Sequence, residues 1–419
     1  MAEKMKDQLV EHVFRHEYGK IVSILLSRFG PSHLEHIEDA VQESLIKAMN
    51  LWAFEPPGNP TAWLLRVAGN QLIDTLRRKK KMDITANTEL FDRGHASPKE
   101  ITLEHTINDS QLKTIFACCH PAISKEYQIV LSLKLIGGFG NREIARALLK
   151  KEEAVAKSFT RAKKRLKESV KTLDVPVEIG LRSRLAIVLK VIYLMFTEGY
   201  TASQGEVPIK RDICLEAIRL ALLLTKNAYC NRAEVHALIA LMCFHTSRFD
   251  ARMDEHGDLV DLEHQDRGKY DRELIQVGIG HLEGATVETD PSDYHLQAAV
   301  AYYHCAAPNF AQTDWQSILN LYQMQLNQQY SPIVHLNWIV PFHKVHGPKK
   351  AFLELMKFEK GPYFKDGALF YALKAELLAE LKDYLPARAA LQKAIYLTSN
   401  QLEKKHLQKK LESYPSTPT

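Results

Sequence analysis

The sequence predicts an all-α protein with two small helical modules followed by a larger helical domain. Apolar residues recur with helical spacing along almost the whole chain, and no convincing alternating strand pattern appears. Polar or Pro/Gly-rich stretches divide the 419 residues into three blocks, as expected at about 100–200 residues per domain. The last block is rich in Ala and Leu, which is typical of closely paired helices.

Composition limits the class of protein. Hydrophobic residues make up 46% of the chain and charged residues 25%, so global disorder is excluded. The net charge of +5 is too small to indicate nucleic-acid binding without a local cluster. The longest apolar run, 185–196, contains Lys190 and is too short for a membrane span. The cysteines are scattered without a CxxC pair, so we expect a reduced, cytoplasmic protein with no cofactor and no membrane partner.

Junctions follow from residues that cannot continue a helix. EPPGNP at 55–60 predicts a rigid loop, and the polar stretch 79–98 predicts a linker. TLDVPVEIG at 172–180 marks a second junction. We therefore expect a first module at 1–80, a linker at 81–105, a second module at 106–172 and a C-terminal extension at 181–419.

The first block is predicted to hold three helices, and the third of them carries a basic face. In TAWLLRVAGNQLIDTLRRKKK, starting at Thr61, apolar residues from Trp63 to Leu76 can pack inward. Arg66, Asn70, Asp74, Arg77 and Arg78 fall largely on another face. Lys and Arg neutralise phosphates, and Asn70 is suited to hydrogen-bond base edges. The alternative is a solvated helix end whose basic residues complement the helix dipole.

The second block predicts a helix-turn-helix. Ser124 is expected to cap a helix that glycines stop near Gly137. A short helix at 141–149 and a turn then lead to a helix at 154–170 that is strongly basic. The N-terminal part of such a second helix enters the DNA major groove. The alternative is a helical hairpin with a lysine-rich surface.

The order of these motifs resembles a known family. DAVQESLIKAM, the Pro/Gly loop and AWL…AxNxxIDxLRR resemble region 2 of sigma-70-type transcription factors of the extracytoplasmic-function group. The resemblance implies that the polar helix docks on the clamp helices of the RNA polymerase β′ subunit through Asp39, Gln42, Glu43 and Leu45. It also implies that the loop at 54–61 captures a base flipped out of the −10 promoter element. The implied −10 contacts are Asn59, Trp63, Arg66, Asn70, Asp74, Arg77 and Arg78.

The second block resembles region 4 of the same family, which reads the −35 element. By position, the DNA contacts it implies are Lys157, Thr160, Arg161, Lys164 and Arg165. Ala156 stands where some relatives carry a basic residue. The linker would run near the RNA exit path, and the β flap is an expected partner. Both modules occurring in this order indicate the family more strongly than either motif alone.

The third block is predicted to be a helical-repeat domain. In 368–397, Tyr371, Ala375, Leu378, Ala387, Leu391 and Ala394 fit the large and small positions of a tetratricopeptide repeat. Segments 212–245 and 293–326 are similar in character. IVLKVIYLMFTEGYTAS, HGDLVDLEHQDRGKYDRELIQVG and CCHPAIS resemble the sigma subgroup that carries a tetratricopeptide-like C-terminal extension. The resemblance implies that the extension contacts and regulates the sigma modules.

Two groups of residues leave other chemistry open. Cys118, Cys119 and His120 suggest zinc, but neighbouring residues chelate one ion poorly, so a buried or semi-buried helix end is the favoured interpretation. A second cluster is acidic and contains histidines: Asp254, Glu255, His256, Asp258, Asp261, Glu263, His264, Asp266 and Asp271. It suggests a metal or hydrolase site, or ion pairs with Arg267, Lys269 and Arg272 or a contact surface toward the sigma modules. It contains no HExxH motif.

We therefore predict a non-enzymatic alternative sigma factor that needs no metal. It binds core RNA polymerase and promoter DNA and is regulated by its own C-terminal domain. The rival hypotheses are a helical-repeat adaptor whose basic N-terminal region tethers it to nucleic acid, and an enzyme built on the acidic cluster.

Overall fold

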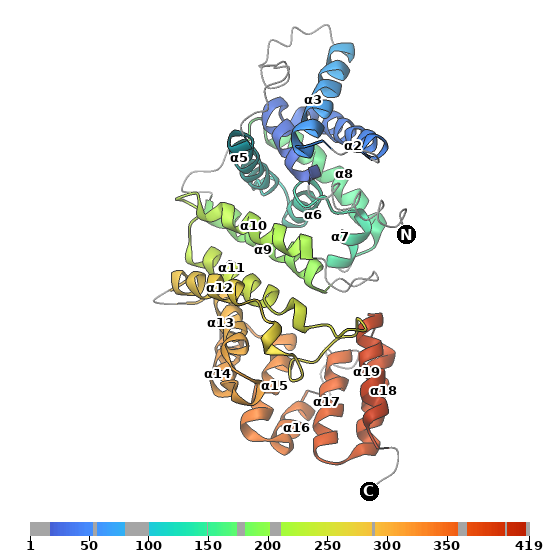
Figure 1. The fold of residues 1–419 in the computed structure, drawn as a ribbon, viewed down its shortest axis with the longest axis vertical. Coiled ribbons are helices and arrows are strands. Elements are labelled where there is room, and N and C mark those ends of the chain that lie inside the picture. Colours follow the sequence, from blue (N-terminus) through green and yellow to red (C-terminus); the bar gives the residue numbers. More distant parts are fainter. Residues whose placement is uncertain are drawn as a thin grey trace. The chain divides into compact units, whose positions relative to one another are not determined.

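A computed structural model of the chain describes residues 17–52, 57–79, 100–148, 150–173, 181–201, 211–286, 290–358, 367–398 and 400–415. These residues form helices and connecting turns (Figure 1), and the predicted all-α class is confirmed. Within the described ranges, extended pairing is limited to an isolated antiparallel bridge between Met253 and Leu259. No described helix is long and apolar enough to cross a membrane.

The chain divides into two compact units. The first comprises Met1–Gly199 and Asp212–Asn231, and the second comprises Tyr200–Arg211 and Arg232–Thr419. The helices α9 and α10, which follow the predicted junction at 172–180, therefore lie mostly in the first unit.

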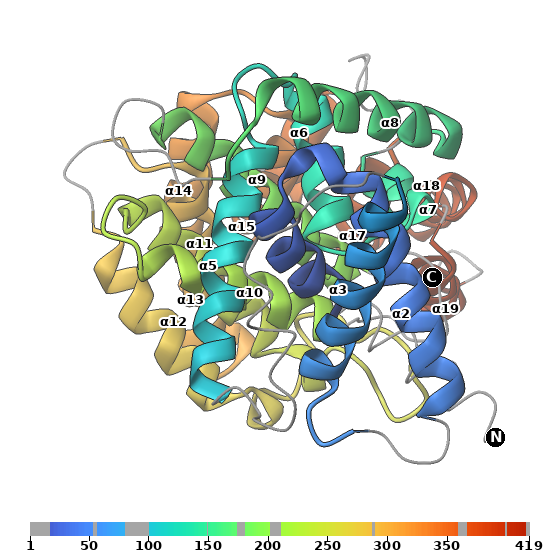
Figure 2. The same ribbon diagram turned by 90° about the horizontal axis from the view of Figure 1, so that it is seen from above.

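The first unit begins with a helical segment at 17–29. Its further elements are η1 (Pro31–His33), α2 (Leu34–Leu51), α3 (Pro60–Lys79), α5 (Glu100–Cys118), α6 (Lys125–Leu135), α7 (Asn141–Ala147), α8 (Glu152–Ser169), and most of α9 (Leu181–Thr201) and α10 (Arg211–Thr225). The predicted cap is present, because Ser124 accepts a hydrogen bond from the backbone N–H of Tyr127 at 3.4 Å. Helices α6, α7 and α8 pack against one another (Figures 1 and 2).

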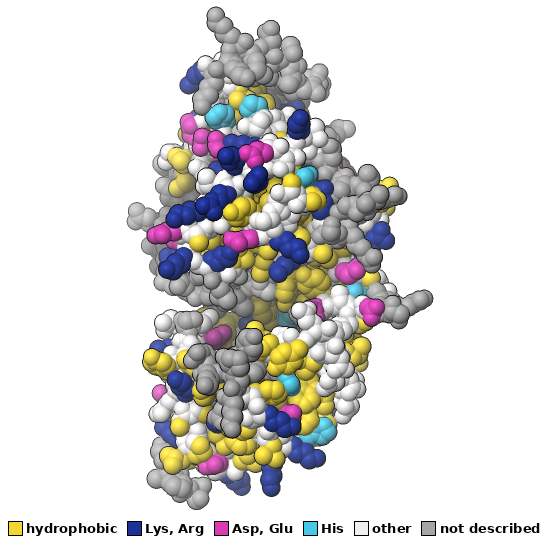
Figure 3. Space-filling model, turned by 180° about the vertical axis from the view of Figure 1, so that it is seen from behind, with side chains coloured by type: hydrophobic (Ala, Val, Ile, Leu, Met, Phe, Trp, Pro, Cys, Tyr) yellow, Lys and Arg dark blue, Asp and Glu magenta, His cyan; other side chains and the backbone are white. Residues whose placement is uncertain are grey.

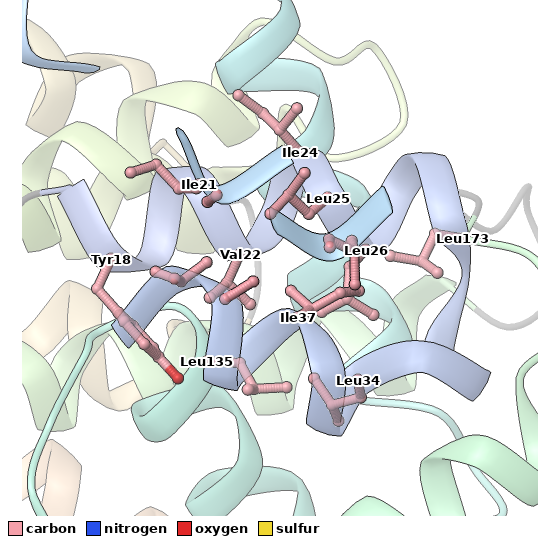
Figure 4. Close-up of a cluster of buried hydrophobic side chains, with 14 of the residues drawn as sticks. Tyr18, Ile21, Val22, Ile24, Leu25, Leu26, Leu34, Ile37, Leu135 and Leu173 are labelled. Carbon is pink, nitrogen blue, oxygen red and sulfur yellow. The ribbon is translucent and has the colours of Figure 1, made fainter. Parts of the chain in front are cut away.

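One hydrophobic core joins the two N-terminal blocks. Side chains of 17–29, α2 and α3 pack with side chains of α5, α6 and α8 in a single buried cluster. Figure 4 shows Leu135 of α6 and Leu173 among the buried residues Tyr18 to Ile37. The contact is close at Gly19, where a Cβ atom would overlap the carbonyl oxygen of Ile136. The two blocks therefore form one packed body, which block-by-block patterning does not indicate.

The second unit is a succession of helices in which neighbours along the chain pack together (Figure 1). Its elements are α11 (Ala233–Thr246), η3 (Phe249–Ala251), η4 (Arg267–Lys269), α12 (Arg272–Gly284), α13 (Asp293–Ala306), η5 (Phe310–Gln312), α14 (Trp315–Gln328), α15 (Pro332–His346), α16 (Pro348–Met356), α17 (Ala368–Glu380), α18 (Tyr384–Leu397) and α19 (Gln401–Ser413). Helix α11 is apolar on every side and lies against both α12 and α13.

The pair α17 and α18 packs closely through small residues. Ala375 of α17 and Ala387 and Ala394 of α18 are fully buried, and Leu391 is buried with them. Alanine side chains let helix backbones approach, and leucine fills the remaining space. The residues assigned to the small repeat positions thus lie at this helix contact.

Candidate nucleic-acid and protein interfaces

The outer face of α2 presents polar and apolar residues together. Asp39, Gln42 and Glu43 are exposed, as a docking surface requires. Ile46 is 57% exposed and Met49 39% exposed, and both continue the same helical stripe. Ile46 and Met49 therefore form an exposed apolar pair beside the polar residues of this helix. We call Asp39, Gln42, Ile46 and Met49 the α2 face.

Two residues predicted for this surface have other contacts. Leu45 is only 3% exposed and lies in the core, where it supports α2 and presents nothing to a partner. Glu43 forms an ion pair with Lys47 at 3.2 Å and accepts a hydrogen bond from Gln71 of α3. Glu43 therefore ties α2 to α3, while Asp39 and Gln42 extend into solvent.

Helix α3 presents the polar face that its sequence predicts. Arg66, Asn70, Asp74, Arg77 and Arg78 are all exposed. The Asn59 side chain accepts a hydrogen bond from the backbone N–H of Ala62 at 2.9 Å, so it caps the helix start. These five residues form a continuous polar surface that ends in two arginines.

Trp63 lies at the start of α3 and is half-buried. Its ring meets Trp52 edge-on, with centroids 5.3 Å apart and planes at 67°. This pair stands at the two ends of the loop predicted to hold a flipped base. Residues 53–56, which include the first three positions of that loop, lie outside the described part of the chain, as does most of the predicted linker.

Helix α8 carries its basic residues on two different faces. Lys157, Thr160, Arg161, Lys164 and Arg165 are exposed, and the side chain of Lys164 is 80% accessible. Figure 3 looks at the side of the first unit on which α8 lies and shows a row of Lys and Arg side chains. The opposite face buries Val155, Ala162 and Leu166 against the core. The exposed row has the spacing and charge that suit a nucleic-acid groove.

Two lysines at the edge of this helix bind α2 instead. Lys163 contacts Glu38 at 2.7 Å, and Lys167 contacts Glu35 at 2.9 Å. The hydrogen bond and charge of Lys167 lower the pKa of Glu35. Lys163 also lies 4.7 Å from the centre of the Phe159 ring. We call Lys163–Glu38 and Lys167–Glu35 the α2–α8 clamp. Sequence patterns do not predict this clamp, because its paired residues are more than 120 positions apart in the chain.

Helices α9 and α10 hold α5 through two arginines. Arg184 of α9 donates to the carbonyl oxygens of Phe116 at 2.5 Å and Cys119 at 3.1 Å, at the C-terminal end of α5. Arg219 of α10 donates to the side chains of Gln111 at 2.5 Å and Asn108 at 3.2 Å. Helix carbonyls at a C-terminus lack internal partners, so Arg184 satisfies two of them.

The alternative sites have structural explanations. Cys118 and Cys119 are buried at the end of α5, and burial raises the pKa of Cys119 to about 12, so it stays a thiol. In the acidic cluster, Asp258 binds Lys405 and Lys409, and Asp261 contacts His406 at 3.0 Å. The cluster therefore forms ion pairs with α19. Its predicted partner Arg267 instead donates to the carbonyl oxygen of His304. Among the described residues, no group of three or more His, Cys, Asp or Glu is placed to hold a metal ion.

Comparisons with known proteins agree with part of this picture. Residues 13–82 match the family Sigma-70 region 2, and residues 184–286 match DUF6596, a family of unknown function. An uncharacterized protein of Rhizobium meliloti (strain 1021) is 34% identical over 393 residues, which cover 92% of each chain. No solved structure matches.

Proposed function

We propose that this chain is an extracytoplasmic-function-type alternative sigma factor, which directs core RNA polymerase to a specific set of promoters. The chain belongs to the same family as the Rhizobium meliloti protein and is a sigma-70-type factor. The α2 face would dock on the β′ clamp helices, and the exposed face of α3 would contact the −10 element. The exposed row of α8 would read the −35 element as part of a helix-turn-helix. The protein would act in the cytoplasm without catalysing a reaction itself.

The observation that carries the proposal is the partition of charged and apolar residues among these helices. The α2 face is mixed polar and apolar, as protein interfaces are. Most of the exposed residues assigned to DNA on α3 and α8 are basic or hydrogen-bonding, as on nucleic-acid surfaces. The family match to Sigma-70 region 2 covers α2 and α3, so it supports a sigma-type role for that region.

The packed first unit supports a regulated sigma factor. The −35 and −10 elements are about 25 base pairs apart, or about 85 Å of B-DNA at 3.4 Å per pair. Helices α3 and α8 share one hydrophobic core, so they cannot reach both elements in this arrangement. The packed state is therefore a closed state, and the α2–α8 clamp must separate before promoter binding.

The extension is proposed to stabilise the closed state. Arg184 and Arg219 come from helices beyond the predicted sigma modules, and the α5 residues that they hold belong to the second predicted module. A tetratricopeptide-like arrangement of α11–α19 would then carry the input that releases this hold.

Transcription in vitro tests the function. Purified full-length chain and core polymerase are incubated with fragmented genomic DNA of the host, and transcript 5′ ends are sequenced. We expect 5′ ends preceded by a shared pair of sequence elements, absent with core polymerase alone. Glu35→Lys places a positive charge beside Lys167, so it should weaken the clamp and increase these transcripts several-fold. If both forms yield only the transcripts of core polymerase, the sigma function is wrong. DNA binding without polymerase binding would favour the adaptor.

A further inference from the structure

The second unit contains a cavity of about 1040 Å³ that the proposed function does not use. Its walls come from the loop that follows η3 and from α14, α15, α17 and α19. Figure 1 shows that loop reaching over to α19, and the Asp258 and Asp261 ion pairs hold it there. Cavities of roughly 300–1,000 Å³ are typical of small-molecule sites.

Several aromatic side chains line the cavity and form an aromatic wall. The rings of Phe310 and Trp315 meet at 68° with centroids 5.0 Å apart, and His304 lies 5.5 Å from Trp315. Burial and the charge of Arg248 lower the pKa of His304 to about 3, so its ring is uncharged at neutral pH. Tyr322 also lines the cavity. This wall suits the face or edge of a ligand ring.

Charges of both signs also line the cavity in pairs, and Lys344 lies 5.4 Å from the centre of the Phe310 ring. Glu376 contacts Lys410 at 3.2 Å, Glu380 contacts His343 at 2.7 Å and Lys344 at 3.9 Å, and Asp261 contacts His406. The carboxylates are 40–45% exposed, so each pair contributes little and exchanges partners at small cost. The wall thus offers a partner both for an ammonium and for a carboxylate, and its charges nearly cancel. A polyanion such as nucleic acid does not fit that balance.

Helix α15 adds an uncharged polar group. Pro341 lies inside this helix and has no N–H, so the carbonyl of Asn337 loses its usual helical donor. Asn337 and Pro341 both line the cavity. An acceptor in that position suits a ligand N–H group.

We propose that this cavity binds a small zwitterion with an aromatic body, of the aromatic amino acid or dipeptide class. The ring packs on Phe310 and Trp315, the carboxylate contacts Lys344 or Lys410, and the ammonium contacts Glu376 or Glu380. The proposal does not depend on the sigma function, because binding is measured without polymerase or DNA.

Calorimetry with the full-length protein and L-phenylalanyl-L-tyrosine tests the site. We expect saturable binding of one molecule with a Kd below about 0.1 mM. Alanyl-alanine, which lacks rings, and the N-acetylated, C-amidated Phe-Tyr, which lacks charges, should bind about tenfold more weakly or not at all.

Variants locate the binding. Trp315→Ala and Lys344→Met should each weaken the dipeptide about tenfold. Tyr396→Ala and Lys349→Met remove an exposed ring and an exposed charge outside the cavity, so they should leave the Kd unchanged. Thermal unfolding of every variant checks that it is folded. If Trp315→Ala does not fold, Lys344→Met alone tests whether the dipeptide binds in the cavity. Absence of saturable binding, equal binding of the blocked peptide, or equal loss in the outer variants would overturn the proposal.

Discussion

Lysine and arginine on α8 have different roles according to the side on which they lie. Lys157, Arg161 and Lys164 point into solvent, while Lys163 and Lys167 bind glutamates of α2. A helix turns 100° per residue, so neighbours such as Lys163 and Lys164 face different surroundings. Residue type alone therefore overstates how many of these side chains are available to DNA.

Replacing Arg161 by Ala tests base reading by this helix. If the guanidinium contacts a base, the change weakens −35 binding by about 1–3 kcal/mol and relaxes specificity at one position. Fluorescence anisotropy with the promoter found by sequencing, and with single-base variants of it, measures both effects. Lys164→Ala is the control for a phosphate contact and should weaken binding equally on every sequence. An equal loss for Arg161→Ala would make that residue a phosphate contact too.

Acid should destabilise the second unit through buried histidine. The pKa of His304 falls to about 3 in the folded state because of burial and the charges of Arg248 and Arg267. The unfolded chain binds the proton at its ordinary pKa near 6.5, so stability is complete above that value and falls as pH decreases. Between pH 7 and pH 5 the loss is about 2 kcal/mol.

Urea unfolding of the full-length chain at the two pH values measures this loss. His304→Gln cannot take up the proton and should show a correspondingly smaller difference between pH 7 and pH 5. The prediction is wrong if the variant and the original chain lose equal stability.

At the scale of single helices, α2 presents different residues to the core and to solvent. Its inner face places Leu45 in the core, and its outer face presents Ile46 and Met49. Because the exposed residues are not needed for packing, their substitution separates binding from folding.

Ile46→Glu should weaken core polymerase binding about tenfold or more, because it places a charge in the apolar part of the α2 face. Surface plasmon resonance with immobilised core polymerase measures the Kd. Leu385→Glu alters a residue that is 75% exposed on α18 and should change nothing. Unchanged binding of Ile46→Glu, with a normal melting temperature, would contradict the docking of this face.

At the scale of the whole chain, the compact units decide where it can be divided. A fragment ending at 175 removes Arg184 and Arg219 and leaves the α5 carbonyls of Phe116 and Cys119 without these donors. A fragment ending at 231 keeps the first unit whole. The two fragments therefore differ in packing as well as in length.

We expect the 1–231 fragment to unfold cooperatively. The 1–175 fragment should lose about 3 kcal/mol or more, because exposed apolar surface and unpaired carbonyls replace buried contacts. Circular dichroism during urea titration compares them. Equal stability of the two fragments would show that α9 and α10 add nothing to the first unit.

Several features follow from local sequence. Helical periodicity indicated the all-α class, Ser124 indicated the start of its helix, and the density of Lys and Arg at 154–170 indicated the basic helix α8. These succeed because caps and amphipathic faces depend on residues within a few positions of each other. The motifs around Asp39 and Asn70 likewise indicated a sigma-70 region 2, which the family match supports.

Other features depended on packing between distant segments. Periodicity placed an apolar face on each helix but not the neighbour that covers it, so the shared core and the close approach at Gly19 emerged only in three dimensions. Leu45 looked like part of an interface and lies inside. Asp258 had basic neighbours in sequence yet pairs with lysines about 150 residues away. The sequence therefore established the helices and their polar and apolar faces. Tertiary packing decided which of these faces remain exposed to solvent and which are covered by, or paired with, distant segments of the chain.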